Sequence, residues 1–265
     1  MNDSNKSSNE SSSVPSPRRR VLEWRDLHFG QLPNASLCLK NSNVQLHSGE
    51  LAIIRTNTSQ NTRRFASMLQ GLIRPDRGSV LFGGRDWSKQ HIRTQLKMRS
   101  RIGRVFDGNG WIANLNIREN LYLAKQHHGS SVKEIETQLD FWAEWFQIGT
   151  ITRKRPSQIE LSQLQVFQWI RSFLGPPSLV ILERPMRAIS TIMREKFVAS
   201  IEHLQSLGST AVWIAGNTFD NIASNVKHDL YMDLRPRELV NDDDDDSKTN
   251  ETTDPSDPIE NGDPS

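Results

Sequence analysis

Side chains able to bind metal or phosphate follow two short apolar runs, at the places where buried strands are expected to end. The run 51–54 leads into a polar stretch that ends at Thr62, and the run 179–182 leads into Glu183. A hydroxyl and a carboxylate are oxygen ligands that Mg²⁺ accepts together with phosphate. Thr62 and Glu183 are therefore candidate metal ligands, although Thr62 could instead cap the helix that follows it. Three arginines near the first run could supply positive charge to a phosphate: Arg55, Arg63 and Arg64.

The other residue types that could do chemistry are arranged less favourably. His127 and His128 are adjacent at the end of a predicted helix, which favours solvent exposure or helix capping over metal binding. Cys38 is the only cysteine, so it forms neither a disulfide within the chain nor a zinc site by itself. The aspartates at 242–246 are adjacent in a polar segment and lack the fixed geometry of a metal site. We interpret them as part of a solvated tail.

Composition limits the class of protein. The 265 residues suffice for one large α/β domain, and the formal net charge is +2. Ten acidic residues lie in 241–265, so the segment between the tails is basic. A basic surface suits a nucleotide, nucleic acid, a lipid surface or an acidic protein face, and a solvated Lys/Arg surface explains it equally well. No apolar run approaches the roughly 20 residues that span a bilayer, and the polar N-terminus does not resemble a signal peptide, so we expect a cytoplasmic protein.

The elements that must position the candidate residues alternate between strand and helix patterns. The polar segments 1–20 and 241–265 are predicted to be disordered because they cannot bury enough apolar surface. The predicted strands are 21–29, 37–46, 51–54, 79–82, 102–106, 179–182 and 210–215. The predicted helices are 61–72, 132–147, 161–174 and 191–207, and 229–240 is predicted to close the domain as a hairpin. This alternation favours an α/β domain with a partly parallel sheet.

Several segments match a known family in order and spacing. They are GELAII at 49–54, GLIRPDRGSVLFGG at 71–84, IGRVF at 102–106, LNIRENL at 115–121 and LVILERP at 179–185. With these segments, the chain resembles an ABC-transporter ATP-binding subunit over about residues 21–240. The resemblance implies an α/β, P-loop NTPase-like ABC ATPase domain, with a mixed sheet core, an antiparallel β part and a helical subdomain at about 108–175.

The phosphate loop of that family follows the pattern G-x-x-x-x-G-K-[ST]. The aligned residues here are Arg55, Thr56, Asn57, Thr58, Ser59, Gln60, Asn61 and Thr62. Both glycines are replaced, and side chains there penalise the backbone curl that places N–H groups around phosphate. Asn61 replaces the lysine, which removes a charge-assisted contact. Only Thr62 still fits the pattern.

The resemblance places further substitutions at the other functional positions. The family's signature segment LSGGQ aligns with Ile159, Glu160, Leu161, Ser162 and Gln163. Asp107 takes the place of the glutamine that contacts Mg²⁺ and the attacking water. Arg184 replaces the catalytic glutamate, so no general base remains there, and Gly216 replaces the histidine that senses the γ-phosphate. Phe29 is either a base-stacking aromatic residue or part of the core.

The resemblance implies ATP and Mg²⁺ as cofactors, and these substitutions argue against their use. Phosphoryl transfer depends on positioning and charge stabilisation, and the loss of one such group costs two to three powers of ten, so we expect no useful hydrolysis. We therefore interpret the chain as a degenerate ABC subunit with a structural or regulatory role. Two alternatives stay open: a divergent but active ATPase, and a binding module for an anionic partner.

The partners implied by the resemblance are an ABC transporter membrane subunit and a second ATP-binding subunit. The second subunit would form a homodimer, or a heterodimer with a competent ATPase, and nucleic acid is not an expected partner. The chain would then lie at the inner face of the membrane through its partner. The Gly-rich loop before Trp111 favours an exposed contact, and we hypothesise that residues 111–119 dock the membrane subunit.

Overall fold

The computed structural model of the chain describes residues 18–30, 39–56, 59–108, 110–186, 189–216 and 226–234. The predicted tails lie outside these ranges, except that residues 18–20 lead into the first strand. Of the phosphate-loop positions, Asn57 and Thr58 also lie outside the described residues, and the side chains of Ser59 and Gln60 are not described.

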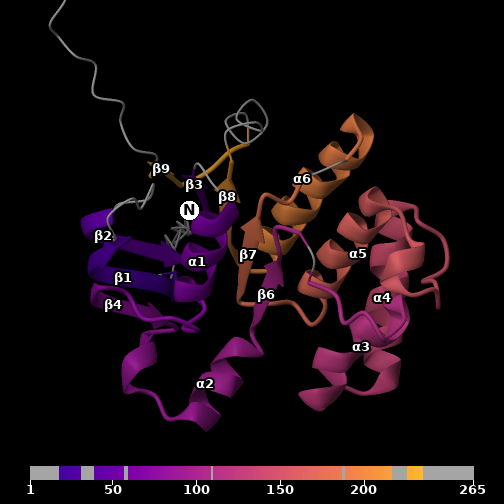
Figure 1. Cartoon of the computed structure of the whole chain (residues 1–265), viewed down its shortest axis with the longest axis horizontal. Coiled ribbons are helices and arrows are strands. Elements are labelled where there is room, and N and C mark those ends of the chain that lie inside the picture. The colour runs from indigo at the N-terminus through magenta and orange to yellow at the C-terminus, as the bar shows by residue number, and fades with distance from the viewer. Residues whose placement is uncertain are drawn as a thin grey trace, which may run out of the picture.

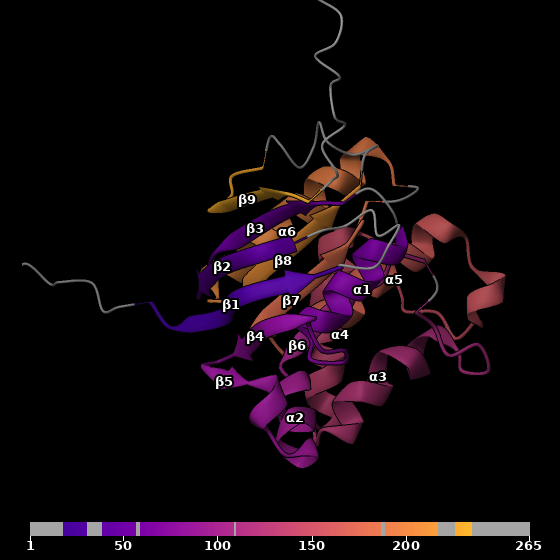
Figure 2. The same ribbon diagram turned by 60° about the vertical axis from the view of Figure 1, so that its left-hand side comes forward.

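Two sheets form the framework (Figures 1 and 2). The antiparallel sheet has the order β2-β1-β4-β5, and its strands are β1 (Arg20–Phe29), β2 (Leu39–His47), β4 (Arg77–Phe82) and β5 (Arg85–Asp86). The parallel sheet has the order β6-β7-β8-β3-β9. Its strands are β3 (Leu51–Arg55), β6 (Ile102–Val105), β7 (Leu179–Glu183), β8 (Thr210–Ala215) and β9 (Leu230–Asp233).

Strands β3, β7 and β8 are almost wholly apolar because both faces of the sheet are covered there. Alternate residues along β3, β7 and β8 enter two different hydrophobic clusters. One cluster, with Ile53 and Trp213, packs under the helices of the second half of the chain. The other, with Ile54 and Ile214, packs against the helix after β3 and the antiparallel sheet. Successive strand residues point to opposite faces of the sheet, so the parallel sheet contributes one face to each of the two hydrophobic clusters.

The helices fill the segments between the strands. They are α1 (Ser59–Leu69), α2 (Ile92–Arg99), α3 (Ile117–His127), α4 (Val132–Phe146), α5 (Leu161–Phe173) and α6 (Thr191–Ser206), with 3₁₀ turns at Trp87–Lys89 and Pro156–Gln158. Capping boxes start two of them: Asn116 with Glu119 begins α3, and Ser131 with Glu134 begins α4. The predicted ranges agree with these elements to within a few residues, and α2, α3 and the short strand β5 are additions.

Only the first arm of the predicted closing hairpin at 229–240 lies within the described residues, and it forms a strand. Residues Leu230–Asp233 form β9, which pairs in parallel with β3 at the edge of the parallel sheet. Residues 235–240 lie outside the described part of the chain. A short apolar run beside turn residues does not reveal its partner, and here the open edge of β3 accepts it. Within the described ranges, no helix combines the length and hydrophobicity that crossing a membrane requires.

Candidate nucleotide site

The site lies where the parallel strands end. Strands β3, β6, β7 and β8 run in the same direction, so their carboxyl ends meet at one edge of the sheet. Thr56 follows β3, Asp107 follows β6, Arg184 follows β7 and Gly216 follows β8. The structure thus brings together the positions that the sequence singled out, although they are far apart along the chain.

At the end of β3, Thr56 and Thr62 contact each other. Their hydroxyl oxygens are 2.6 Å apart, and both residues are fully buried. The backbone N–H of Thr56 donates to the carbonyl of Ala215 at the end of β8, over 2.9 Å. Asn61, at the position of the family's lysine, is also buried. The Thr62 hydroxyl is therefore satisfied within the protein, facing a second hydroxyl.

Glu183 forms a buried ion pair with Arg104, a residue that the sequence analysis did not single out. The Nε of Arg104 donates to Oε1 of Glu183 over 2.5 Å, and the two side chains are 4% and 0% exposed. The same guanidinium donates to Oε1 of Gln70 and Oγ of Ser67, and it lies over the ring of Phe106. Arg104 thus places a permanent cation against the candidate metal ligand.

A second ion pair joins two of the substituted catalytic positions. Nη1 of Arg184 lies 3.2 Å from Oδ2 of Asp107, whose side chain is 1% exposed, while that of Arg184 is 22% exposed. The Arg184 backbone takes a φ of 43°, and its N–H donates to the carbonyl of Ile214. Gly216 lies so close that a Cβ there would be 2.8 Å from Nε of Arg184. Because Gly216 has no side chain, there is room beside it for the guanidinium of Arg184.

The three arginines proposed as compensating charge have other contacts. Arg55 points along the sheet edge toward β9, where Nη1 lies 3.8 Å from Oδ2 of Asp233. Arg63 donates to the backbone carbonyl of Asp107 over 3.1 Å. Arg64 lies over the ring of Phe29, which is buried against Phe65 and therefore belongs to the core.

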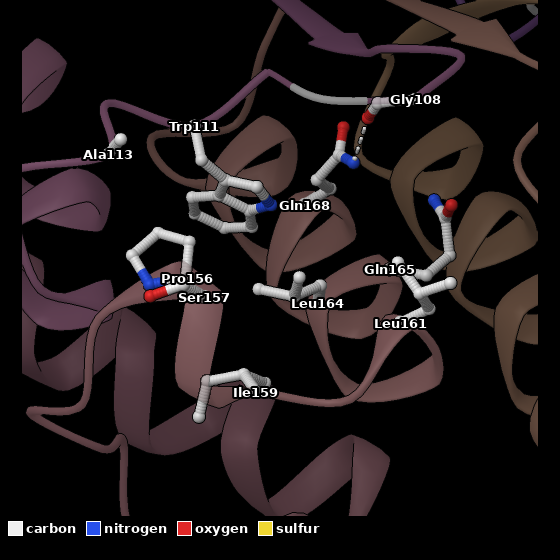
Figure 3. A pocket seen from close by; sticks show the side chains of 10 residues that line it. All are labelled: Gly108, Trp111, Ala113, Pro156, Ser157, Ile159, Leu161, Leu164, Gln165 and Gln168. Carbon is white, nitrogen blue, oxygen red and sulfur yellow. Dashed lines mark hydrogen bonds between the residues drawn. The ribbon is translucent and has the colours of Figure 1, made fainter.

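The segment at the signature position begins α5. Ile159 ends the 3₁₀ turn before it, and Glu160 is the N-cap without a side-chain cap bond. Leu161, Ser162 and Gln163 form the first turn of α5, and Leu161 is 76% exposed. Beside this turn is a largely apolar pocket of about 500 Å³, shown in Figure 3. It is lined by Gly108, Trp111, Ala113, Pro156, Ser157, Ile159, Leu161, Leu164, Gln165 and Gln168.

Two residues on α5 hold the loop after β6, and sequence reasoning missed both. Gln168 accepts from the N–H of Phe106 and donates to the carbonyl of Gly108, each over 3.0 Å. Nη1 of Arg171 donates to the carbonyl of Gly110, and its guanidinium lies 4.5 Å from the ring centroid of Trp111. Burial lowers the pKa of Arg171 to about 10. Trp111 is therefore half-buried under an arginine, and it is less exposed than the Gly-rich loop suggests.

The ABC transporter family profile matches residues 39–187, more than half of the chain. The chain belongs to the ABC transporter family. The predicted α/β ABC ATPase fold is confirmed as well. The dimeric ATP-binding cassette MJ0796, solved in a post-hydrolysis state with ADP and Pi, superposes with a TM-score of 0.69 over 81% of this chain and 94% of that one. At 19% sequence identity, that likeness concerns the fold alone.

Relatives of this ABC chain have been named as ATP-binding proteins. The lipoprotein-releasing system ATP-binding protein LolD of Buchnera aphidicola is 28% identical over 56% of this chain and 65% of its own length. The sulfate/thiosulfate import ATP-binding protein CysA of Pectobacterium atrosepticum is 23% identical over 73% of this chain and 58% of its own length. The chain spans less than two thirds of both proteins. An uncharacterized ABC transporter ATP-binding protein of Thermotoga maritima is 24% identical and is covered over 86% of its length.

The described residues of this ABC chain do not fit Mg²⁺. Thr62 is hydrogen bonded to Thr56, and Glu183 is paired with Arg104, so both candidate oxygen ligands already have partners within the protein. A cation beside Arg104 would also be repelled by its guanidinium. Within the described ranges, no group of three or more His, Cys, Asp or Glu side chains is arranged to hold a metal ion. Among the described residues at this position, Thr62, Glu183 and Arg184 instead pair with side chains of the protein.

Proposed function

We propose that this ABC subunit is a non-hydrolysing structural or regulatory component of a membrane transport complex. The observation that carries the proposal is the pair of arginine–carboxylate contacts, Arg104 with Glu183 and Arg184 with Asp107, at the strand ends where a family member would hold Mg²⁺ and a general base. Each contact replaces an interaction with a bound group by an interaction within the protein. In this proposal the subunit keeps the architecture of the family but does not hydrolyse ATP.

The two ion pairs also suggest how the subunit works without turnover. Arg104 on β6 links that strand to the end of β7, and Arg184 links the end of β7 to the loop after β6. Gln168 then connects this loop to α5. The strand ends and the helical segment are therefore fixed to each other by the protein itself. We infer that the subunit presents one permanent conformation to its partners, where an ATPase would change conformation with its nucleotide.

The first test is calorimetry of the purified protein with ATP and Mg²⁺, followed by a phosphate-release assay. We expect no heat of binding up to millimolar ATP and no phosphate release above the buffer, because several charge-stabilising groups are absent together. A cassette with an intact phosphate loop serves as the positive control. Measurable turnover would contradict the proposal and would favour a divergent, active ATPase. Tight binding without release would retain the scaffold but make nucleotide part of it.

We further propose that the membrane subunit docks beside α3. The hollow there measures about 430 Å³ and is lined by Leu115, Asn116, Arg118, Glu119, Tyr122, Leu123, Gln126 and Arg153. Its wall is held by the Asn116–Glu119 capping box and by an ion pair between Arg118 and Glu136. Shape and mixed polarity suit an inserted helix of a partner. Docking there would bring the subunit to the inner face of the membrane, as the family resemblance implies.

Reversing the charges of Arg118 and Glu119 is expected to abolish co-purification with the permease partner, since both side chains line the hollow. The capping box at the start of α3 would also be lost, so the control is Glu134→Arg, which removes the equivalent cap of α4 outside the hollow. Retained co-purification in the α3 variant would exclude this docking site. Loss in both variants would assign the effect to helix stability.

A further inference from the structure

The outer face of α2 combines exposed aliphatic and cationic side chains. We name this surface the α2 patch and define it by Ile92, Arg93, Leu96 and Lys97 of α2 together with Lys89 of the preceding 3₁₀ turn. We propose that this patch contacts an anionic membrane surface directly. The contact is additional to docking on a membrane subunit, and it requires no partner protein.

The apolar part of the α2 patch faces solvent. Ile92 and Leu96 are four residues apart on one helical face, and they are 56% and 49% exposed. Removing two such side chains from water is favourable wherever an apolar phase is within reach. A single exposed leucine needs no explanation, but two aliphatic side chains stacked along one short helix form a surface that suits partial insertion at a lipid interface.

The charged side chains of the patch are all cationic. Residues 87–106 contain no aspartate or glutamate. Lys89, Arg93 and Lys97 are exposed, and the described part of the chain places no carboxylate within ion-pair distance of them. By contrast, the buried Arg104 and the partly buried Arg184 are each paired with a carboxylate. Three unpaired cations around two aliphatic side chains are complementary to a surface with anionic headgroups above an apolar interior.

The patch is held in place from its inner face. Gln95 donates to the carbonyls of Trp87 and Gln90, Arg99 donates to the carbonyl of Gly71, and Met98 is buried. At about 100° per residue, Met98 lies on the side of α2 opposite to Leu96, while Gln95 and Arg99 lie on the flank next to Ile92. The helix therefore cannot turn its apolar side chains inward. The backbone of the patch is already ordered, so binding costs little conformational entropy.

The position of α2 agrees with a membrane contact. In both views of the molecule α2 lies at the lower end, while α6 lies toward the opposite end (Figures 1 and 2). In Figure 1, α3 also lies along the lower edge, and it carries the hollow where we propose that the membrane subunit docks. A lipid contact at α2 and a permease contact at α3 are thus compatible with one orientation. The α2 proposal does not depend on the docking proposal.

The test is sedimentation of the full chain with vesicles, without any permease. We expect binding to vesicles of phosphatidylcholine and phosphatidylglycerol in equal parts, weak binding to pure phosphatidylcholine, and loss of binding at high salt. Arg93→Glu with Lys97→Glu is expected to weaken binding at least about 25-fold, from roughly fivefold for each cation removed. Ile92→Asp with Leu96→Asp is expected to abolish it.

Matched variants separate the patch from total charge and total hydrophobicity. Lys133→Glu with Lys227→Glu makes the same change in net charge on other elements, and Ile192→Asp removes an exposed aliphatic residue from α6. Both controls are expected to bind the mixed vesicles like the native chain to within about twofold, because charges away from the interface contribute little beyond a Debye length. Melting temperatures verify that every variant is folded.

Three results would overturn the α2 proposal. One is equal binding of the native chain and the Arg93→Glu, Lys97→Glu variant to the mixed vesicles. Another is binding to pure phosphatidylcholine as strong as to the mixture. The third is duplex DNA binding the native chain more tightly than the vesicles and losing affinity in the same variants, which would identify the patch as a nucleic-acid surface. None of these results bears on ATP binding or permease docking, so the proposals fail separately.

Discussion

Replacing Arg104 by alanine is expected to lower the free energy of unfolding by about 3 to 5 kcal/mol, because it leaves the buried carboxylate of Glu183 without its counter-ion. Chemical denaturation of the native and variant chains would measure the change. Glu183→Gln is expected to cost a similar amount, since it leaves the Arg104 guanidinium buried and unpaired. Both effects concern stability, because the pair holds the ends of β6 and β7 together.

Two controls separate burial from the mere presence of an ion pair. Arg25 contacts Glu23 with nearly the same geometry, Nε to Oε1 over 2.6 Å, but its side chain is 53% exposed. The Glu23 side chain is itself 4% exposed, but Arg20 and Gln45 also contact its carboxylate. Arg25→Ala should therefore change stability less than Arg104→Ala, because the Arg25 guanidinium reaches water and the carboxylate keeps other partners. Arg104→Met combined with Glu183→Leu should recover most of the loss, as apolar replacement of a buried pair often does. Equal losses for Arg25→Ala and Arg104→Ala would contradict a special role for the buried pair.

Restoring the two most conspicuous family residues, by Asn61→Lys with Arg184→Glu, is expected to yield no ATP hydrolysis. The new glutamate would lie beside the buried Asp107 and next to Glu183, so three carboxylates would crowd one strand end. Arg104 would still neutralise Glu183, leaving Mg²⁺ without that ligand. We expect a loss of stability on the order of 3 kcal/mol, from the loss of the Asp107 partner, and no phosphate release above the native chain.

A stepwise series tests this explanation. Adding Asp107→Gln to the double variant removes one of the crowded carboxylates and should recover the lost stability. Adding Arg104→Gln as well frees Glu183 as an oxygen ligand, so a heat of Mg²⁺ binding should first arise at this step, measured by calorimetry. Hydrolysis by the original double variant would show that the arginine pairs do not block the site. The step at which binding first arises thus shows whether the native site lacks required residues or is blocked by its arginine pairs.

The substitutions at the nucleotide position are mutually adapted, and this bears on how the site changed. Arg184 needs the space that Gly216 leaves and the charge that Asp107 supplies. Arg104 needs Glu183 together with the polar contacts of Gln70 and Ser67. Taken alone, Asp107, Arg184 and Gly216 each indicate the loss of a catalytic group. Together they form a site in which the charges are balanced without a ligand, and this favours a stable scaffold over an impaired enzyme.

Much of the fold follows from local sequence patterns. The apolar runs at β3, β7 and β8 predict buried strands, because a strand covered on both faces needs apolar residues throughout. The four predicted helices are recovered because an amphipathic face repeats every 3.6 residues. α2 gives no such signal, since it exposes Ile92 and Leu96, buries only Met98, and is anchored by hydrogen bonds from Gln95 and Arg99. A helix with exposed aliphatic residues and anchoring polar residues cannot be predicted from hydrophobic periodicity, because its contacts are known only from the tertiary structure.

The sequence by itself determined that the phosphate loop lacks its glycines and lysine, and that Arg184 stands where a general base would be. Both conclusions depend only on which residue type stands at each motif position. A neighbouring side chain cannot give Arg55 or Gln60 the backbone freedom of glycine, nor make Arg184 a general base. Only the tertiary structure decided what the replacements do. Arg104 and Glu183 are 79 positions apart, and they meet because β6 and β7 pair in parallel with Arg104 opposite Ile181, two residues before Glu183 on the same face. Such contacts depend on strand register, which local sequence does not encode.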